Sequence, residues 1–167
     1  MILGVSASTF TLLHVVISLI AIATGLVVAA GLILRRLVPG WTGVFLATTV
    51  LTSVTGFFFP GKFGPPQAVG VISLILLAMA IYALYARQLT GRWRPVFVIS
   101  AVVSLYFNVF VAVIQTFQKV APFHALAPTQ TEPPFAVAQG TVLLAFVIAG
   151  VVAVKRFRPA ASGFAAA

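Results

Sequence analysis

The sequence predicts an all-α protein, a polytopic integral membrane bundle of five transmembrane helices with the N-terminus outside and the C-terminus inside. Of its 167 residues, 62% are hydrophobic and 7% are charged, whereas a soluble domain carries about 25% charged residues. Five apolar runs exceed about 18 residues, the length that crosses a bilayer. The short alternating segments of a membrane β-barrel do not occur. The runs are therefore predicted to be helices, which pair their own backbone groups inside lipid.

The membrane domain is predicted to cover residues 1–158 and to be followed by a flexible tail at residues 159–167. The first span ends at an arginine pair and lacks a positive n-region, so it is predicted to be retained rather than cleaved as a signal peptide. Prolines mark the later boundaries, because proline fits the first turn of a helix but breaks its interior. The spans are expected at residues 9–34, 41–59, 67–85, 95–117 and 135–154.

Basic side chains gather on one side of the predicted bundle. Eight of the ten follow the first, third or fifth span, whereas Lys62 and Lys119 lie on the other side. Basic residues in short loops mark the cytoplasmic face. The sequence therefore predicts a bacterial-type inner (plasma) membrane protein whose basic face contacts anionic lipid headgroups. The predicted lipid contacts are Arg35, Arg36, Arg87, Arg92, Arg94, Lys155, Arg156 and Arg158.

One face of the first span combines small and polar residues at helical spacing: His14, Ser18, Ala21, Gly25 and Ala29. Such a face lets a neighbouring helix approach closely. Two interpretations of His14 stay open. It is either hydrogen-bonded between packed helices or in contact with a ligand, because ionisable groups inside a membrane are costly and usually functional.

A polar stripe follows one face of the fourth span: Ser100, Ser104, Asn108, Gln115 and Lys119. The spacings of four and seven residues place all five on one side of a helix. Asn108 is expected about 16 Å below Lys119, at about 1.5 Å per residue. Its amide must find partners there, either on a neighbouring helix or, together with Gln115, in a ligand-binding cavity.

The connection after the fourth span is expected to be an extended outer loop that prolines restrict. It carries His124 and Glu132, which either pair across it or are solvated, and Gln139 lies about one turn inside the fifth span. A predicted outward-facing pocket between the first, fourth and fifth spans would be formed by His14, Asn108, Gln115, Lys119, His124, Glu132 and Gln139. Aromatic side chains would surround its mouth: Phe57, Phe58, Phe59, Phe63, Phe117, Phe123 and Phe135.

Several chemistries are excluded by residue types that the sequence lacks. It has no aspartate and one glutamate, outside the spans, which argues against cation transport through buried acids and against paired-carboxylate hydrolysis. It has no cysteine, hence no thiolate metal site. Nucleophile-elbow, zinc and phosphate-loop motifs do not occur. We assign no catalytic residue, cofactor or metal, and an enzyme is less favoured than a non-enzymatic protein.

Three functions remain open. The favoured one is an accessory subunit, or a binder of a lipid-like or small polar ligand, with membrane lipids and a membrane-protein partner or a second copy as partners. The first alternative is a small transporter or channel for a neutral or anionic solute. The second is an electron-transfer or quinone-reactive protein with His14 and His124 as axial ligands of a b-type haem. The membrane accounts for the basic residues, so no nucleic-acid partner is expected.

Overall fold

The computed structural model describes residues 2, 4–60 and 64–158. Lys62, Phe63 and the tail predicted at residues 159–167 lie outside the described residues. The predicted all-α class is confirmed for the described part, which contains an isolated β-bridge between Ile2 and Val5 but no strand. The helices are α1 (Ala7–Ile33), α2 (Pro39–Gly56), α3 (Pro65–Ile81), η1 (Tyr82–Ala86), α4 (Trp93–Lys119), α5 (Ala121–Leu126) and α6 (Pro133–Arg156).

Helix boundaries follow the local sequence. Ser6 caps α1, because its hydroxyl accepts a hydrogen bond from the Thr9 N–H at 3.1 Å. Prolines occupy the first turn of α2, α3, α5 and α6, where the missing N–H has no helical partner to lose. Pro122 starts α5 in this way, so a short helix occupies part of the connection that the sequence predicts to be an extended loop.

In the described part of the chain, four helices are long and apolar enough to cross a membrane: α1, α3 with its π-helical continuation η1, α4 and α6. The second predicted span corresponds to α2, which has 18 residues and is not among these four. Its threonines and glycines make it less apolar than its neighbours.

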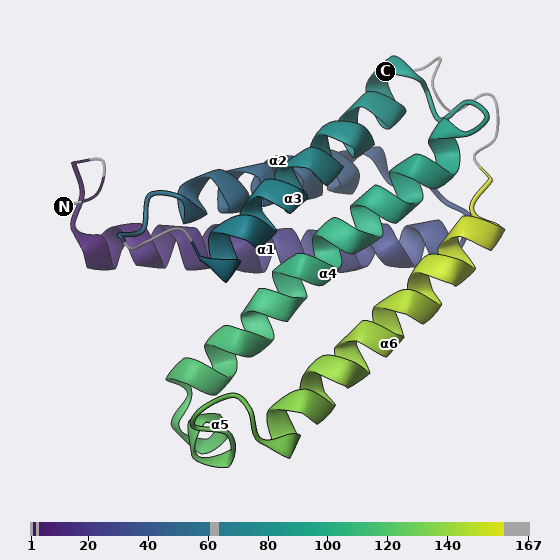
Figure 1. Cartoon of the computed structure of the whole chain (residues 1–167). Helices are drawn as coiled ribbons and strands as arrows, with labels where there is room; N and C mark the ends of the chain where they lie inside the picture. The colour runs from purple at the N-terminus through teal and green to yellow at the C-terminus, as the bar shows by residue number, and fades with distance from the viewer. Residues whose placement is uncertain (1, 3, 61–63, 159–167) are drawn as a thin grey trace.

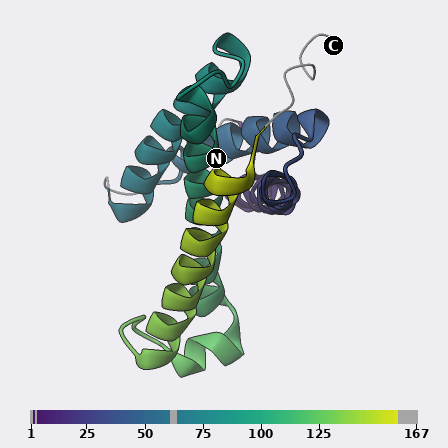
Figure 2. The same cartoon turned by 90° about the vertical axis from the view of Figure 1, so that its right-hand side faces the viewer.

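The helices form two antiparallel pairs joined by α3. Figure 1 shows α1 beside α2 and α4 beside α6, with α3 between α2 and α4. Figure 2 views the N-terminal helix almost end-on while α4 and α6 run along the picture, so α1 crosses α4 steeply. The pairs meet near the arginine-rich ends of the helices and diverge toward the N-terminus of α1 and the C-terminus of α4.

The buried core lies at the end where the pairs meet. It includes Val28 and Leu32 of α1, Phe45 of α2, and Phe97 and Leu105 of α4. The diverging end has less buried apolar area, and the candidate site lies there.

Candidate functional site

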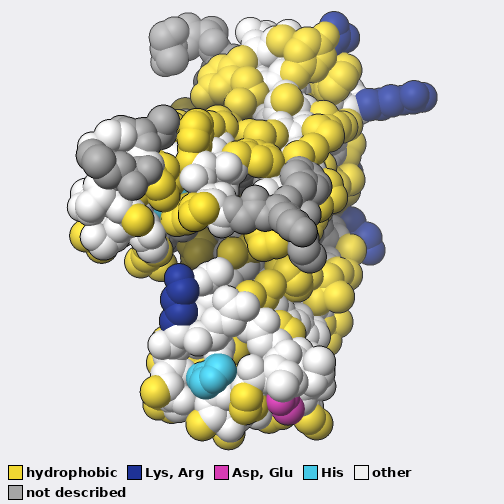
Figure 3. All heavy atoms as spheres, turned by 60° about the vertical axis from the view of Figure 1, so that its left-hand side comes forward, with side chains coloured by type: hydrophobic (Ala, Val, Ile, Leu, Met, Phe, Trp, Pro, Cys, Tyr) yellow, Lys and Arg dark blue, Asp and Glu magenta, His cyan; other side chains and the backbone are white. Residues whose placement is uncertain are grey.

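A cavity of about 530 Å³ lies between α1, α2, α3 and α4 at the diverging end. In Figure 3 the surface is hollowed between the upper helices and the lower end of the molecule, and a basic side chain stands at the lower edge of the hollow. The cavity brings together four of the predicted site residues: His14, Asn108, Gln115 and Lys119. It differs from the predicted pocket in its other walls, which are α2 and α3 rather than the fifth predicted span.

The wall contributed by α1 carries Thr11, His14 and Ser18, which share one helical face because they are three and four residues apart. Ser18 donates to the His14 carbonyl at 2.7 Å and lies 3.4 Å from Thr52 Oγ1 of α2. The polar groups of this wall therefore connect α1 to α2. None of them offers a ligand a permanently charged partner.

His14 is held by α2 in a defined orientation. Its Nδ1 lies 2.7 Å from Thr55 Oγ1, and its ring meets the Phe59 ring edge to face at 5.0 Å between centroids. The Thr55 hydroxyl also lies 2.7 Å from the Leu51 carbonyl oxygen, to which it donates. Both expected roles of His14 are compatible with this geometry, because the ring is bonded between helices and also lines the cavity.

The wall contributed by α4 contains the predicted polar stripe. Asn108 Nδ2 lies 3.3 Å from Thr49 Oγ1 of α2, a weak interhelical hydrogen bond. Gln115 is different, because neither end of its amide is hydrogen-bonded within the described part of the chain and its Oε1 is buried. An unpaired buried amide oxygen costs about 1–3 kcal/mol. The Gln115 amide is therefore the group in this wall that most needs an external partner.

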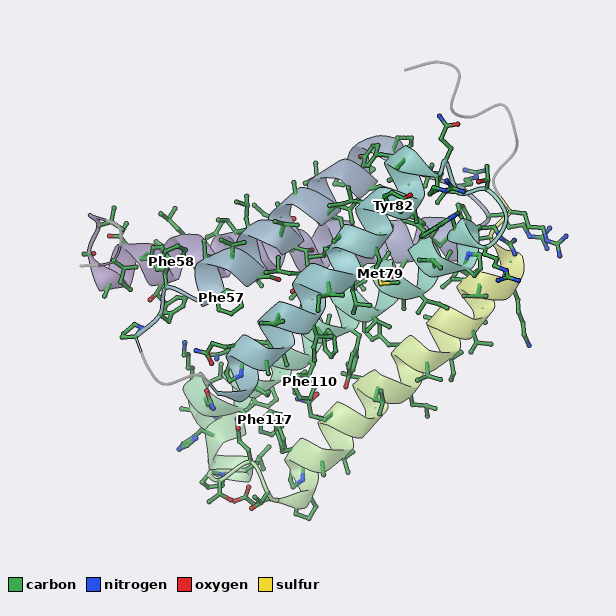
Figure 4. The ribbon with its side chains drawn as sticks, turned by 45° about the horizontal axis from the view of Figure 1, so that its top comes forward. Phe57, Phe58, Met79, Tyr82, Phe110 and Phe117 are labelled. Atoms are coloured by element: carbon green, nitrogen blue, oxygen red, sulfur yellow. The ribbon has the colours of Figure 1, made fainter. Side chains whose placement is uncertain are left out.

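Sequence reasoning missed the contribution of α3, whose predicted span looked nearly featureless. Gln67, Gly70 and Ser73 of α3 line the cavity. The sequence contains a pattern that indicates this wall. Gln67, Gly70 and Ser73 are three residues apart and therefore share one face of the helix. Phe57 of α2 packs against this face, since a Cβ at Gly70 would lie 3.3 Å from Phe57 Cζ. Figure 4 shows Phe57 at the end of α2.

A packed layer closes the cavity toward the arginine-rich end. Gly25 lies so close to its neighbours that a Cβ there would be 2.5 Å from Leu105 Cδ1 and 2.8 Å from Phe45 Cε2. Ser100 and Ser104, the deeper members of the polar stripe, are 1% and 0% exposed. The stripe therefore continues as packed core in this conformation, and a transport route would require the layer of Gly25, Phe45 and Leu105 to separate.

The remaining predicted site residues lie elsewhere. His124 is exposed in α5, and its Nδ1–H donates to the Phe117 carbonyl at 3.3 Å. Gln139 of α6 donates from Nε2 to the Phe110 carbonyl at 3.1 Å. Phe110 and Phe117 lie between α4 and α6 (Figure 4). Neither His124 nor Gln139 lines the cavity. The side of α4 that forms a wall of the cavity is opposite the side against which α6 packs.

Glu132 does not pair with His124. The Thr129 N–H and hydroxyl donate to its Oε1 at 3.1 and 2.9 Å, and the Thr131 N–H donates to its Oε2 at 3.0 Å. Desolvation raises the pKa of Glu132, but the hydrogen bonds to its carboxylate together outweigh it and hold the pKa below its ordinary value. The single side-chain carboxylate of the chain is thus committed to ordering the turn before α6.

The predicted aromatic mouth divides into two groups. Phe57 and Phe59 line the cavity. Phe117 instead packs edge to face against Phe123 and Phe135, with centroids 5.5 and 5.4 Å apart, and so fastens α5 and α6 to α4. Phe58 packs against Phe10 at 6.4 Å.

The eight predicted lipid-contacting residues also divide. Arg94 is half-buried and donates from Nη1 to the carbonyl of Phe157, the residue that follows α6. Arg87 lies over the Trp93 ring at 5.5 Å, in the geometry of a cation–π contact. Arg87 is exposed, and so are the other six: Arg35, Arg36, Arg92, Lys155, Arg156 and Arg158. Arg94 therefore has a structural role that the loop-charge pattern did not indicate.

Within residues 2, 4–60 and 64–158, no group of three or more histidine, cysteine, aspartate or glutamate side chains is close enough to hold a metal ion. His14 and His124 do not face a common space, so the described cavity offers one imidazole to a haem rather than two. Comparisons with protein-family models, with curated proteins and with solved structures find no match for this chain.

Proposed function

We propose that this chain is a non-enzymatic membrane protein that binds a lipid-like or small polar ligand in the cavity between α1, α2, α3 and α4. The observation that carries the proposal is the Gln115 amide, which lines the cavity and makes no hydrogen bond in the described part of the chain. Native proteins rarely leave a largely buried amide unpaired. A bound molecule would pair with the end of the amide that faces the cavity.

The lining matches an amphipathic molecule. Polar groups of α1 and α4 lie beside aliphatic side chains of the same helices, such as Val15, Leu19 and Val111. Ligand sites typically combine a mostly apolar lining with a few polar groups that fix orientation. The head of the ligand would lie among His14, Gln115 and Lys119, and its apolar part would lie along the aliphatic side chains.

We further propose that α2 is a fifth membrane span. Its 18 residues correspond to about 27 Å at about 1.5 Å per residue, close to the hydrocarbon thickness of about 30 Å. Its threonines lower its hydropathy but not its ability to cross, because the hydroxyls of Thr42, Thr48 and Thr55 donate to carbonyls one turn earlier. A crossing α2 also explains why the end of α2 and the start of α3 line the same cavity.

With five spans, the basic residues after α1, after η1 and after α6 all lie on one side. The positive-inside rule then favours a cytoplasmic location for that side in an inner (plasma) membrane, with the N-terminus and the cavity outside. The seven exposed basic residues on that side would contact anionic headgroups. The chain has no cysteine, so single cysteines introduced at Thr129 and Gly91 report sidedness directly. An impermeant maleimide added to whole cells should label Thr129→Cys and spare Gly91→Cys, and the reverse would overturn the orientation.

Binding is tested by filling the cavity. Ala112 lines it, and Ala145 of α6 is exposed on the outside of the bundle, so Ala112→Phe and Ala145→Phe form a matched pair. The protein is purified from membranes, and its organic extract is analysed by mass spectrometry. We expect a molecule that co-purifies stoichiometrically with the wild type and with Ala145→Phe and is lost from Ala112→Phe. Equal retention by all three proteins would contradict the proposal.

A further inference from the structure

We propose that the cavity selects a neutral amphiphile with a hydroxylated head group, whose hydroxyls pair with His14 Nε2 and with the Gln115 amide. This inference rests on the proposed function and narrows it to one chemical class. The argument has three parts: the proton position on His14, the unsatisfied amide of Gln115, and the charges around the cavity.

The proton position on His14 follows from its neighbour. The Thr55 hydroxyl has one proton, and the nearby carbonyl oxygens of Leu51 and Thr52, at 2.7 and 3.2 Å, can only accept it. Thr55 Oγ1 must therefore accept at its 2.7 Å contact with His14, so Nδ1 carries the ring proton. The neutral imidazole then presents Nε2 as an acceptor. Nε2 makes no hydrogen bond to the described residues, so it needs a donor from outside the protein.

Gln115 adds a second requirement. Neither its oxygen nor its nitrogen is hydrogen-bonded within the described ranges, and the oxygen is buried. A hydroxyl both donates and accepts, so it satisfies this amide in either orientation. An ether, ester or ketone oxygen only accepts, so it leaves His14 Nε2 unpaired. A hydroxylated head can pair with both side chains, whereas an oxygen group that cannot donate pairs with at most the Gln115 amide.

The charges argue for a neutral head. Glu132, the single side-chain carboxylate of the chain, is outside the cavity, and both its oxygens already accept hydrogen bonds. A cationic head would find no carboxylate counter-ion among the residues that line the cavity. An anionic head would oppose the Nε2 lone pair of His14, and its attraction to the exposed, solvated Lys119 would be weak.

Four radiolabelled probes that share a twelve-carbon chain test this selectivity. They are dodecane-1,2-diol, its dimethyl ether, lauric acid and dodecylamine. Equilibrium binding is measured on the full chain in lauryldimethylamine oxide, a detergent without hydroxyls. We expect the diol to bind about tenfold more tightly than the dimethyl ether, the ratio that one buried hydrogen bond provides, and more tightly than the acid or the amine.

Matched variants locate the selectivity. His14→Asn keeps an N–H near Thr55 but removes Nε2, and Gln115→Leu removes the unpaired amide. We expect both to weaken diol binding, and His14→Asn to bring the diol-to-ether ratio close to one, while the proteins keep the wild-type melting temperature. Gln139→Leu is the control, because Gln139 also has a buried, unpaired Oε1 but lies outside the cavity. It should leave the ratio unchanged.

The outcomes separate this inference from the proposed function. If the ether, the acid or the amine binds as tightly as the diol and is lost from Ala112→Phe, the cavity binds ligands but the head-group assignment is wrong. An undiminished ratio in folded His14→Asn would also overturn it. If none of the four probes binds the wild type, both the head-group assignment and the proposed function fail.

Discussion

His14 Nδ1 lies 2.7 Å from Thr55 Oγ1, and this contact joins α1 to α2 at the end of the molecule where the helix pairs diverge. The two residues are 41 positions apart in the sequence. The buried core lies at the other end. The hydrogen bond orients the imidazole in the cavity wall and, together with the packing of Phe10 against Phe58, limits how far α1 can move from α2.

Replacing Thr55 by valine should lower the free energy of unfolding by about 1 kcal/mol, a typical value for an interhelical hydrogen bond in a membrane protein. The substitution removes the acceptor of His14 Nδ1–H. Thr48→Val is the control, because the Thr48 hydroxyl donates only to carbonyls of its own helix. Thermal unfolding in detergent compares the two variants, and equal melting temperatures would show that the His14–Thr55 contact contributes nothing.

Gly25→Ala should destabilise the packed layer below the cavity. The added Cβ would meet Leu105 Cδ1 at 2.5 Å and two atoms of the Phe45 ring at 2.8 and 2.9 Å. Overpacking of this kind costs about 1–3 kcal/mol. Gly140→Ala is the matched control, because nothing lies within 4 Å of its added Cβ and alanine favours the helix. If the two variants unfold at the same temperature, Gly25 is not closely packed.

Arg94 and Arg92 should respond differently to neutralisation. Arg94→Gln removes a charged donor from the Phe157 carbonyl, and charge-assisted hydrogen bonds are worth about 1.5–3 kcal/mol. Arg92 is exposed, so Arg92→Gln should change stability by less than about 0.5 kcal/mol and reduce bound anionic lipid instead. Thermal unfolding and lipid mass spectrometry separate these effects. A stable Arg94→Gln protein would contradict the structural role of Arg94.

Acidification should loosen the turn before α6. The pKa of Glu132 is lower in the folded chain than its ordinary value, so the ionised carboxylate stabilises the fold at neutral pH. That contribution is lost as the pH falls through the lowered pKa. Hydrogen exchange at the Thr129 and Thr131 amides, which donate to this carboxylate, should accelerate there. Glu132→Gln should remove the pH dependence, and wild-type amides that stay protected at pH 3 would contradict it.

The sequence was sufficient to predict the long helices but not α5. With η1 counted as the end of α3, each predicted span begins and ends within three residues of a helix in the structure, and Pro95 and Pro133 stand in the first turns of α4 and α6. It also predicted that His14, Asn108, Gln115 and Lys119 would line one cavity. Residues at helical spacing share a face of a helix, and polar side chains are scarce in both the first and the fourth predicted span.

The choice of neighbouring helices could not be predicted. Gln139 is polar and lies inside the fifth predicted span, but α6 packs on the other face of α4, where Gln139 donates to Phe110. The rotation and pairing of helices depend on how whole faces fit, and apolar residues on every face of α3 and α6 carry little information about which face is buried. Gln67 and Ser73 were missed for the same reason.

The most direct test of the central claim is photo-crosslinking from inside the cavity. Phe107 lines it, and Leu144 of α6 is 60% exposed on the outside of the bundle. Each is replaced by p-benzoylphenylalanine, the protein is irradiated in its native membrane, and the intact mass is measured. We predict one dominant adduct at position 107, of a molecule that bears hydroxyls, and a mixture of bulk phospholipid adducts at position 144. The same phospholipid mixture at both positions would contradict a ligand-binding cavity.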